Sequence, residues 1–159
     1  MEKTDNNKQK QENYREQFIR LNKAMSNAFY LEAVFIEYSI MEDRTESILK
    51  HMGKWDAYLK KRGRYQVTID SKVKYIQNAA REKRTLPNKY FGDGMLDEIL
   101  EWKEKRNKLI HALLKQSLTT AEIALFAAEG KDLAEILRNR ATNYRRAVQR
   151  QSAKAEKQD

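Results

Sequence analysis

Three polar side chains stand in an otherwise apolar stretch of the sequence, and their types suit acid–base and anion-binding chemistry. Arg106, Asn107 and His111 lie in the run KRNKLIHALL, residues 105–114. A histidine can accept or donate a proton near neutral pH, and a guanidinium can hold an anion through two parallel hydrogen bonds. A surface arginine and a packed histidine would give the same pattern, so the surrounding sequence has to separate the two interpretations.

The residue inventory excludes other routes to chemistry. The chain has no cysteine, which excludes thiolate metal ligands and cysteine nucleophiles. Its only histidines are His51 and His111, and two histidines argue against a multi-histidine metal centre. The sequence therefore predicts neither a metal site nor a cofactor.

The positive charge of the chain is concentrated in two segments. The 159 residues carry 32 Lys and Arg against 23 Asp and Glu, a net charge of +9. Residues 50–90 hold twelve bases and three acids, and residues 131–159 hold eight bases and four acids. Concentrated positive charge is what a phosphate-binding surface requires, although a solvated basic face of a helical protein has the same composition.

Helical periodicity runs through most of the sequence, since apolar residues recur every three to four positions. The expected helices cover residues 14–52, 69–84, 94–117, 119–130 and 131–152. The stretch TLPNKYFGDG, residues 85–94, holds the only proline and two glycines and is expected to be a loop. The sequence thus predicts an all-α bundle of five or six helices with a long basic C-terminal helix.

Local signals mark the expected helix ends. Asp93 is placed to cap the helix that follows it. Thr119 and Glu122 form a capping box that opens a short helix, and Gly130 is expected to end that helix.

Residues 13–152 are expected to form a single domain between two flexible segments, residues 1–12 and 153–159. No apolar run is long enough to span a membrane, and the first residues lack the hydrophobic core of a secretory signal. We therefore expect a cytoplasmic protein that does not enter membranes.

Residues 106–111 resemble the sequence signature of the HEPN domain (higher eukaryotes and prokaryotes nucleotide-binding). That signature is Arg, four to six residues and then His, with Asn, Asp or His favoured directly after the Arg. This chain has Arg106, then Asn107, and His111 after a gap of four residues, on a late helix of a small all-α bundle. The resemblance in architecture covers about residues 14–150.

The resemblance implies metal-independent cleavage of RNA by a homodimer, with Arg106 and His111 of both subunits facing one another in a cleft at the two-fold axis. His111 would take the proton of an attacking RNA 2′-OH or protonate the leaving 5′ oxygen. Arg106 would stabilise the phosphorane charge, and Asn107 would orient its neighbours or bind a phosphate oxygen. It also implies a bacterial toxin or antiphage-defence effector with a cognate antitoxin or defence-system partner.

Helix geometry gives an independent reason for a dimer. Arg106 and His111 are five residues apart, which separates them by roughly 140° around a helix and about 7.5 Å along it. They cannot both point into one pocket from one helix, whereas Asn107 and His111 share a face. Pairing two such helices across a two-fold axis would bring each Arg106 near the partner's His111.

An acidic stretch, IEYSIMEDRTESIL at residues 36–49, is interpreted either as a solvated face or as a source of accessory site residues. Its acids are Glu37, Glu42, Asp43 and Glu46. In the second interpretation Glu42 or Arg44 packs beside Arg106 and His111, where an acid would raise the histidine pKa. Tyr38 is expected in the core.

The basic segment would then follow an RNA backbone, with Tyr58 or Tyr65 stacking on bases. The side chains assigned to this RNA surface are Lys60, Lys61, Arg62, Arg64, Lys72, Lys74, Arg81, Lys83 and Arg84.

The sequence departs from one branch of the HEPN family. That branch has a tyrosine two residues after the His, which a partner nucleotidyltransferase modifies, and this chain has Leu113 there. Regulation by that route is therefore not expected. The alternatives to a nuclease are a non-catalytic HEPN-like helical module that binds nucleic acid or a partner protein, and a helical adaptor that binds only protein.

Overall fold

The computed structural model describes residues 2–63, 67–113, 115 and 117–157, with side chains from residue 8 onward. Within these residues the chain forms seven α-helices and no strand, so the all-α class is confirmed and the helices outnumber the five or six expected. The helices are α1 (Glu2–Ser26), α2 (Tyr30–His51), α3 (Trp55–Arg62), α4 (Ile69–Ala80), α5 (Leu86–Phe91), α6 (Met95–Ala112) and α7 (Thr120–Ala155).

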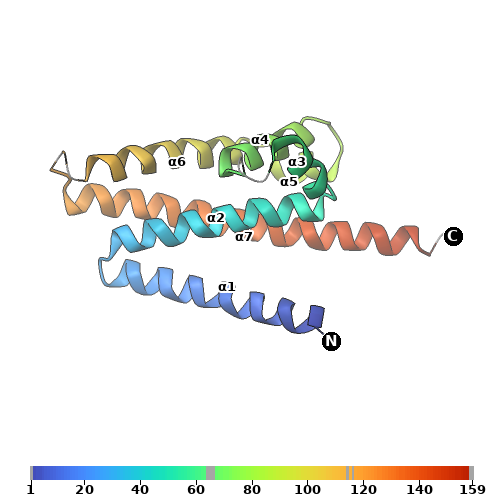
Figure 1. The fold of residues 1–159 in the computed structure, drawn as a ribbon, viewed down its shortest axis with the longest axis horizontal. Coiled ribbons are helices and arrows are strands. Elements are labelled where there is room, and N and C mark those ends of the chain that lie inside the picture. The colour runs from blue at the N-terminus through green and yellow to red at the C-terminus, as the bar shows by residue number, and fades with distance from the viewer. Residues whose placement is uncertain (1, 64–66, 114, 116, 158–159) are drawn as a thin grey trace.

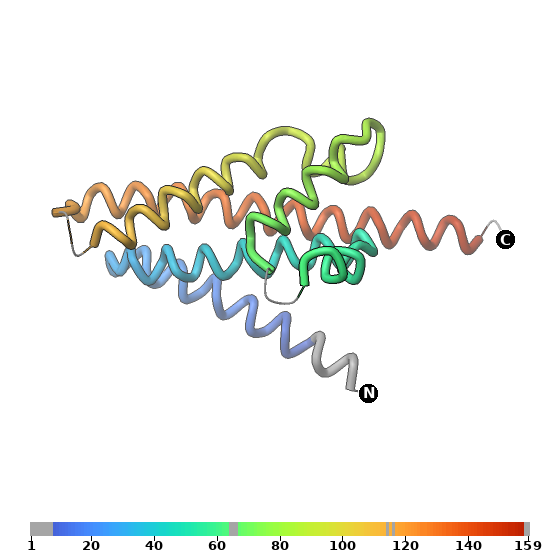
Figure 2. The backbone as a smooth tube through the Cα atoms, turned by 45° about the horizontal axis from the view of Figure 1, so that its top comes forward, coloured from blue at the N-terminus to red at the C-terminus, as the bar shows by residue number. Residues whose placement is uncertain are grey.

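Two antiparallel helix pairs build the body of the fold. One pair is α1 and α2, the other is α6 and α7, and α2 and α7 run in the same direction against each other (Figure 1). The short helices α3, α4 and α5 connect α2 to α6 and gather toward the end of the bundle where α2 finishes (Figure 2). Helix α2 is therefore covered by α1 on one side and by α4 and α7 on others.

The centre of the core is an aromatic contact between α6 and α7. Trp102 is fully buried, and its ring stacks on that of Phe126 with centroids 5.0 Å apart. Its indole N–H donates to the Phe126 carbonyl at 3.3 Å, so the buried polar tip is satisfied. This contact fixes α6 one helical turn before Arg106.

The stretch 14–52, which reads as one helical pattern, is divided between α1 and α2. Ala28 adopts a left-handed φ of 59°, and the Phe29 amide donates to the Ala24 carbonyl at 2.9 Å. That hydrogen-bond closure ends α1 without glycine or proline. Because no glycine or proline marks the break between α1 and α2, the apolar periodicity predicts one continuous helix there.

Gly130 does not end a helix, contrary to the sequence prediction, and α7 continues through it as one long helix. A Cβ atom at this position would collide with Glu37 Oε2 of α2 and would lie 2.5 Å from the Trp102 ring of α6. Glycine therefore stands here because three helices approach too closely for any side chain, and not because the chain must turn.

Of the two predicted helix caps, the structure confirms the one at Thr119 and contradicts the one at Asp93. The capping box is confirmed, with the Glu122 amide donating to Thr119 Oγ1 at 3.2 Å and the Thr119 amide donating to Glu122 Oε2 at 2.8 Å. The cap before α6 is Gly94 rather than Asp93. Asp93 accepts a longer bond from the Met95 amide, at 3.4 Å.

The predicted loop at residues 85–94 contains a helix, α5. Pro87 lies in its first turn, where a missing N–H breaks no helical hydrogen bond, and the Thr85 side chain caps it. Helix α4 ends at Ala80, earlier than the range 69–84 expected.

The expected flexible ends overlap helices in the structure. Residues 2–12 belong to α1, and α7 extends to Ala155. None of the described helices combines the length and apolar character needed to cross a bilayer.

Candidate functional site

Arg106 is held in place by aromatic rings of the neighbouring helix α2. Its Cζ atom lies 4.5 Å from the Tyr38 ring centroid and 5.2 Å from that of Phe35. Its Nη1 atom donates to Asn107 Oδ1 at 3.2 Å. Stacking on aromatic faces fixes the plane of a guanidinium, so Arg106 is a positioned group and not a freely moving surface base.

The Arg106 guanidinium also keeps an unused donor. The side chain is half-buried, and its Nε atom is buried without a hydrogen bond to any described residue. A buried N–H without an acceptor is unfavourable. The Nε donor is enclosed by the fold, so only the outer nitrogens of the guanidinium can bind an anion.

His111 forms no hydrogen bond with the other two residues of the motif in the part of the chain that the structure describes. It is exposed in the last turn of α6. One chain thus joins Arg106 to Asn107 by a hydrogen bond and leaves the His111 imidazole without a bond to either side chain in the described residues. Because Arg106 and His111 are five positions apart, their side chains are separated by roughly 140° around α6.

Tyr38 and Phe35 are site residues that the sequence did not assign. Tyr38 is half-buried rather than in the core, and Phe35 remains 51% exposed beside the guanidinium. Burial raises the pKa of Tyr38, with Glu42 acting in the same direction and Arg106 and Lys103 opposing it. The ring under Arg106 therefore stays a neutral phenol with an intact π face.

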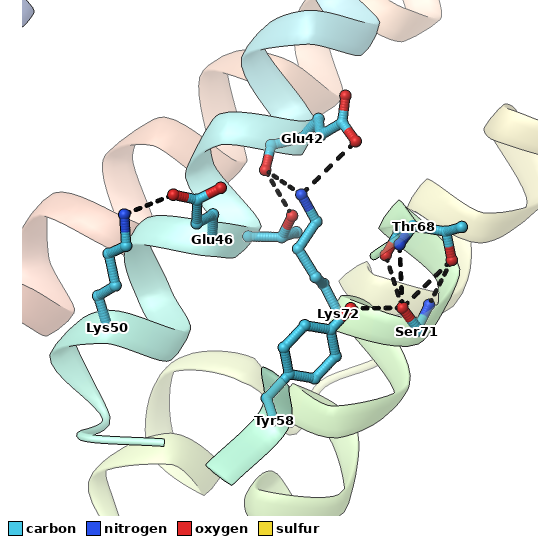
Figure 3. A network of polar contacts seen from close by, with 8 residues as sticks. Glu42, Glu46, Lys50, Tyr58, Thr68, Ser71 and Lys72 are labelled. Atoms are coloured by element: carbon cyan, nitrogen blue, oxygen red, sulfur yellow. Dashed lines mark hydrogen bonds and ion pairs between the residues drawn. The ribbon is translucent and has the colours of Figure 1, made fainter. Parts of the chain in front are cut away.

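Glu42 is the accessory acid that lies on this side of α2, and it is joined to α4. Lys72 Nζ donates to the Glu42 carbonyl at 3.0 Å and lies 3.6 Å from Glu42 Oε1 (Figure 3). Lys72 is only 1% exposed. The assignment of Lys72 to an RNA surface is therefore wrong, because its ammonium faces inward to α2 and cannot reach a phosphate outside the fold.

Arg44, the second proposed accessory residue, belongs to another face. Its Cζ atom lies 4.0 Å from the Tyr14 ring centroid of α1, and its guanidinium pairs with the adjacent Asp43. Arg44 follows Phe35 by nine positions, which places the two side chains roughly 180° apart around the axis of α2. Packing of Arg44 beside Arg106 is therefore contradicted, since the two guanidiniums lie on opposite sides of α2.

The remaining bases of the predicted RNA surface are exposed, except one that lies outside the described residues. The exposed ones are Lys60, Lys61 and Arg62 at the end of α3, Lys74 on α4, and Arg81, Lys83 and Arg84 after α4. Arg64 lies outside the described residues. This surface lies toward the start of α6, whereas His111 lies at its end (Figure 1).

Tyr58 is not available to stack on a base. It is fully buried, and its hydroxyl lies 2.5 Å from Ser71 Oγ (Figure 3). Its ring stacks against Trp55 and meets Tyr75 edge-on. Tyr58 thus joins α3 to α4, while the other aromatic candidate, Tyr65, lies outside the described residues.

One acid of residues 36–49 is buried, contrary to the interpretation of that stretch as a solvated face. Glu37 is fully buried between α2, α6 and α7, and neither carboxyl oxygen has a hydrogen bond to a described residue. Burial raises the pKa of Glu37 to about 9, against a smaller opposing effect of Lys131. The group is therefore a neutral carboxylic acid at pH 7.

In the part of the chain that the structure describes, no three His, Asp or Glu side chains gather as metal ligands. The chain matches none of the protein-family models, curated proteins or solved structures with which it was compared.

Proposed function

We propose that the protein is a metal-independent endoribonuclease of the HEPN type that acts as a homodimer. The observation that carries this proposal is the placement of Arg106, fixed over Tyr38 and Phe35 and bonded to Asn107, on the same helix as an exposed His111. A positioned cation and an accessible imidazole are the two groups that cleavage by the RNA 2′-OH needs.

The proposed reaction uses both groups at one phosphodiester. The 2′ oxygen attacks the adjacent phosphorus while an imidazole takes its proton, and the 5′ oxygen leaves with a proton supplied by a second imidazole. The products are a 2′,3′-cyclic phosphate and a free 5′-OH. Arg106 stabilises the charge of the pentavalent phosphorane, and Asn107 holds the guanidinium in that orientation.

The proposed dimer supplies the imidazole that one chain cannot place beside its own Arg106. Phe35 is 51% exposed next to the guanidinium, and Phe29 is 60% exposed just before α2 begins. Leu125 is 75% exposed near the start of α7. The start of α2, the start of α7 and the end of α6 lie at one end of the bundle (Figure 1). Apolar side chains exposed around the motif favour a second copy as their cover.

The test is incubation of the purified dimer with a labelled unstructured RNA in excess EDTA. We expect cleavage with cyclic phosphate ends, and a loss of about 100-fold or more in both Arg106→Ala and His111→Ala. The matched control is Lys108→Ala, which removes an exposed charge between them on the same helix and should retain activity within about threefold. An RNA with 2′-deoxy sugars should not be cut.

A mixing experiment tests the shared site. If Arg106 of one subunit works with His111 of the other, equal amounts of the two inactive variants should form heterodimers that hold one Arg106 opposite one His111. These heterodimers should recover part of the wild-type activity. Wild-type activity in His111→Ala, or no cleavage by the wild-type dimer, would overturn the proposal. Salt-sensitive RNA binding without cleavage would instead support a non-catalytic module.

A further inference from the structure

A second basic site lies on the opposite side of α2 from Arg106. It is a groove of about 940 Å³ between α1, α2 and α7, within the usual size range of ligand sites. Its lining residues are Lys10, Gln11 and Tyr14 of α1, Arg44, Ser47, Lys50 and His51 of α2, and Arg138, Thr142, Arg145 and Gln149 of α7.

The groove is strongly positive. Five of its lining residues are lysines or arginines, and none is acidic. Two carboxylates near it offset part of this charge, since Asp43 pairs with Arg44 and Lys10, and Glu46 pairs with Lys50. Arg138 and Arg145 form no ion pair with any described residue. Their charges remain available to a ligand.

Aromatic rings hold two of these guanidiniums in fixed planes. Arg44 lies over the Tyr14 ring at 4.0 Å, and Arg138 lies over the Phe18 ring at 4.4 Å. The two rings meet edge-on with centroids 5.5 Å apart. The guanidiniums therefore lose little conformational freedom when they bind an anion, because the rings already restrict them.

Two buried donors of groove residues have no acceptor within the described residues. They are the Nε atom of Arg145 and the hydroxyl of Tyr14. Burial raises the pKa of Tyr14 to about 12, so the hydroxyl keeps its proton. Burial also lowers the pKa of His51, and the nearby charges of Arg145, Arg44 and Lys10 lower it further. The charges of Arg145, Arg44 and Lys10 thus act together on His51 as a positive field in the groove.

We propose that this groove binds a ligand that carries two or more phosphate groups, either a free nucleotide or a stretch of RNA backbone. Phosphate oxygens match bidentate guanidinium donors, and the guanidiniums of Arg138 and Arg145 have no ion pair with a described residue. The site is independent of the cleavage proposed above, since it uses a different face of α2.

The experiment measures binding in the His111→Ala background, which retains the groove and prevents cleavage during the measurement. The probes are a fluorescent 12-nucleotide RNA followed by anisotropy, and ATP and inorganic tripolyphosphate followed by calorimetry. We expect the double variant Arg138→Gln/Arg145→Gln to weaken binding of the probe that fits by about tenfold or more.

The matched control removes the same charge elsewhere. Arg15→Gln/Lys23→Gln changes two exposed bases of α1 outside the groove and should alter affinity by less than about threefold. Saturable binding of ATP or tripolyphosphate identifies a nucleotide site, whereas binding of RNA alone identifies a backbone site, and both support the proposal. Equal losses in the two double variants, or no binding of any probe, would overturn it.

A second variant covers the case in which the arginine changes disturb folding. Thr142→Glu places a carboxylate at a half-buried lining position of α7 without removing a cation. It should weaken phosphate binding at least as much as the arginine variant while the thermal midpoint stays near that of the parent. Unchanged affinity in a folded Thr142→Glu protein would overturn the proposal.

Discussion

Two ionisable side chains are buried at α2, Lys72 from α4 and Glu37 from α2 itself, and they differ in whether hydrogen bonds satisfy them. Lys72 reaches α2 from α4 and bonds the Glu42 carbonyl, with the Glu42 carboxylate nearby. Glu37 lies on α2 itself, and neither of its oxygens has a hydrogen bond to a described residue. Burial lowers the pKa of Lys72, with Glu42 and Glu46 opposing it, and raises that of Glu37 to about 9.

The difference shows what a buried charge requires. An ion can remain charged inside a protein where fixed acceptors replace its hydration, and otherwise it is neutralised. Lys72 has such acceptors on the flank of α2 that also carries Tyr38, while Glu37 faces the Trp102 ring and Gly130. Lys72 therefore joins α4 to α2 through a hydrogen bond and an ion pair, whereas Glu37 joins α2 to α7 by packing against Gly130.

Glu37→Met should produce the largest change, and the change should depend on pH. The ordinary carboxyl pKa is about 4.5 and the folded value is about 9, so between these pH values unfolding releases a proton. The Glu37 contribution to the free energy of unfolding is fully present below pH ~4.5 and falls by about 1.4 kcal/mol per pH unit as the pH rises. Methionine removes that loss.

Urea denaturation at pH 5 and pH 8 measures this effect. The variant should be close to wild type at pH 5 and up to about 4 kcal/mol more stable at pH 8. Glu32→Met, an exposed position on the same helix, is the control and should show no such pH dependence. A constant difference between Glu37→Met and wild type at both pH values would mean that Glu37 is already ionised in the fold.

Lys72→Ala tests the ionic half of the comparison. It removes a hydrogen bond from a charged donor and the buried aliphatic stem, and should cost roughly 3 kcal/mol at pH 7. Lys74→Ala, two residues along α4 and exposed, should change stability by less than about 0.5 kcal/mol. Equal losses in the two variants would contradict the assignment of Lys72 to the interior.

Both buried residues occupy positions on the apolar stripe of their helix, although both are charged residue types. Lys72 lies between Ile69 and Val73 on the buried stripe of α4. Glu37 likewise lies in register with Val34 and Met41 on α2. Periodicity alone would have placed both inside, but their charge favoured a solvated face and an RNA surface. The prediction of exposure for Lys72 and Glu37 therefore rested on their charge and not on their helical position.

The candidate site could be predicted only in part. Spacing along one helix separated Arg106 from His111 and placed Asn107 on the face of His111. The hydrogen bond between Arg106 and Asn107 was not predicted. The ring platform of Phe35 and Tyr38 comes from α2, far away in sequence, and no local pattern identifies it. The groove between α1, α2 and α7 was missed for the same reason.

Gly130→Ala tests how closely the helices approach around Glu37. The added Cβ would collide with the Glu37 carboxyl group and would lie 2.5 Å from the Trp102 ring. The cost of overpacking should exceed the gain in helix propensity and leave a net loss of about 2 kcal/mol. Denaturant titration measures it, with exposed Ala128→Gly as the control for propensity alone. Stabilisation by Gly130→Ala would show that α2 and α6 yield to the methyl group.

Glu42→Gln should have the smallest effect and separates the two acceptors of Lys72. The Lys72 ammonium lies 3.0 Å from the backbone carbonyl of Glu42 but 3.6 Å from its carboxylate. The carboxylate side chain is also 41% exposed. The substitution keeps the shorter bond and removes a weak, partly hydrated ion pair, so the loss should stay below about 1 kcal/mol. A loss as large as that of Lys72→Ala would mean that the carboxylate, rather than the peptide carbonyl, keeps the lysine charged inside the fold.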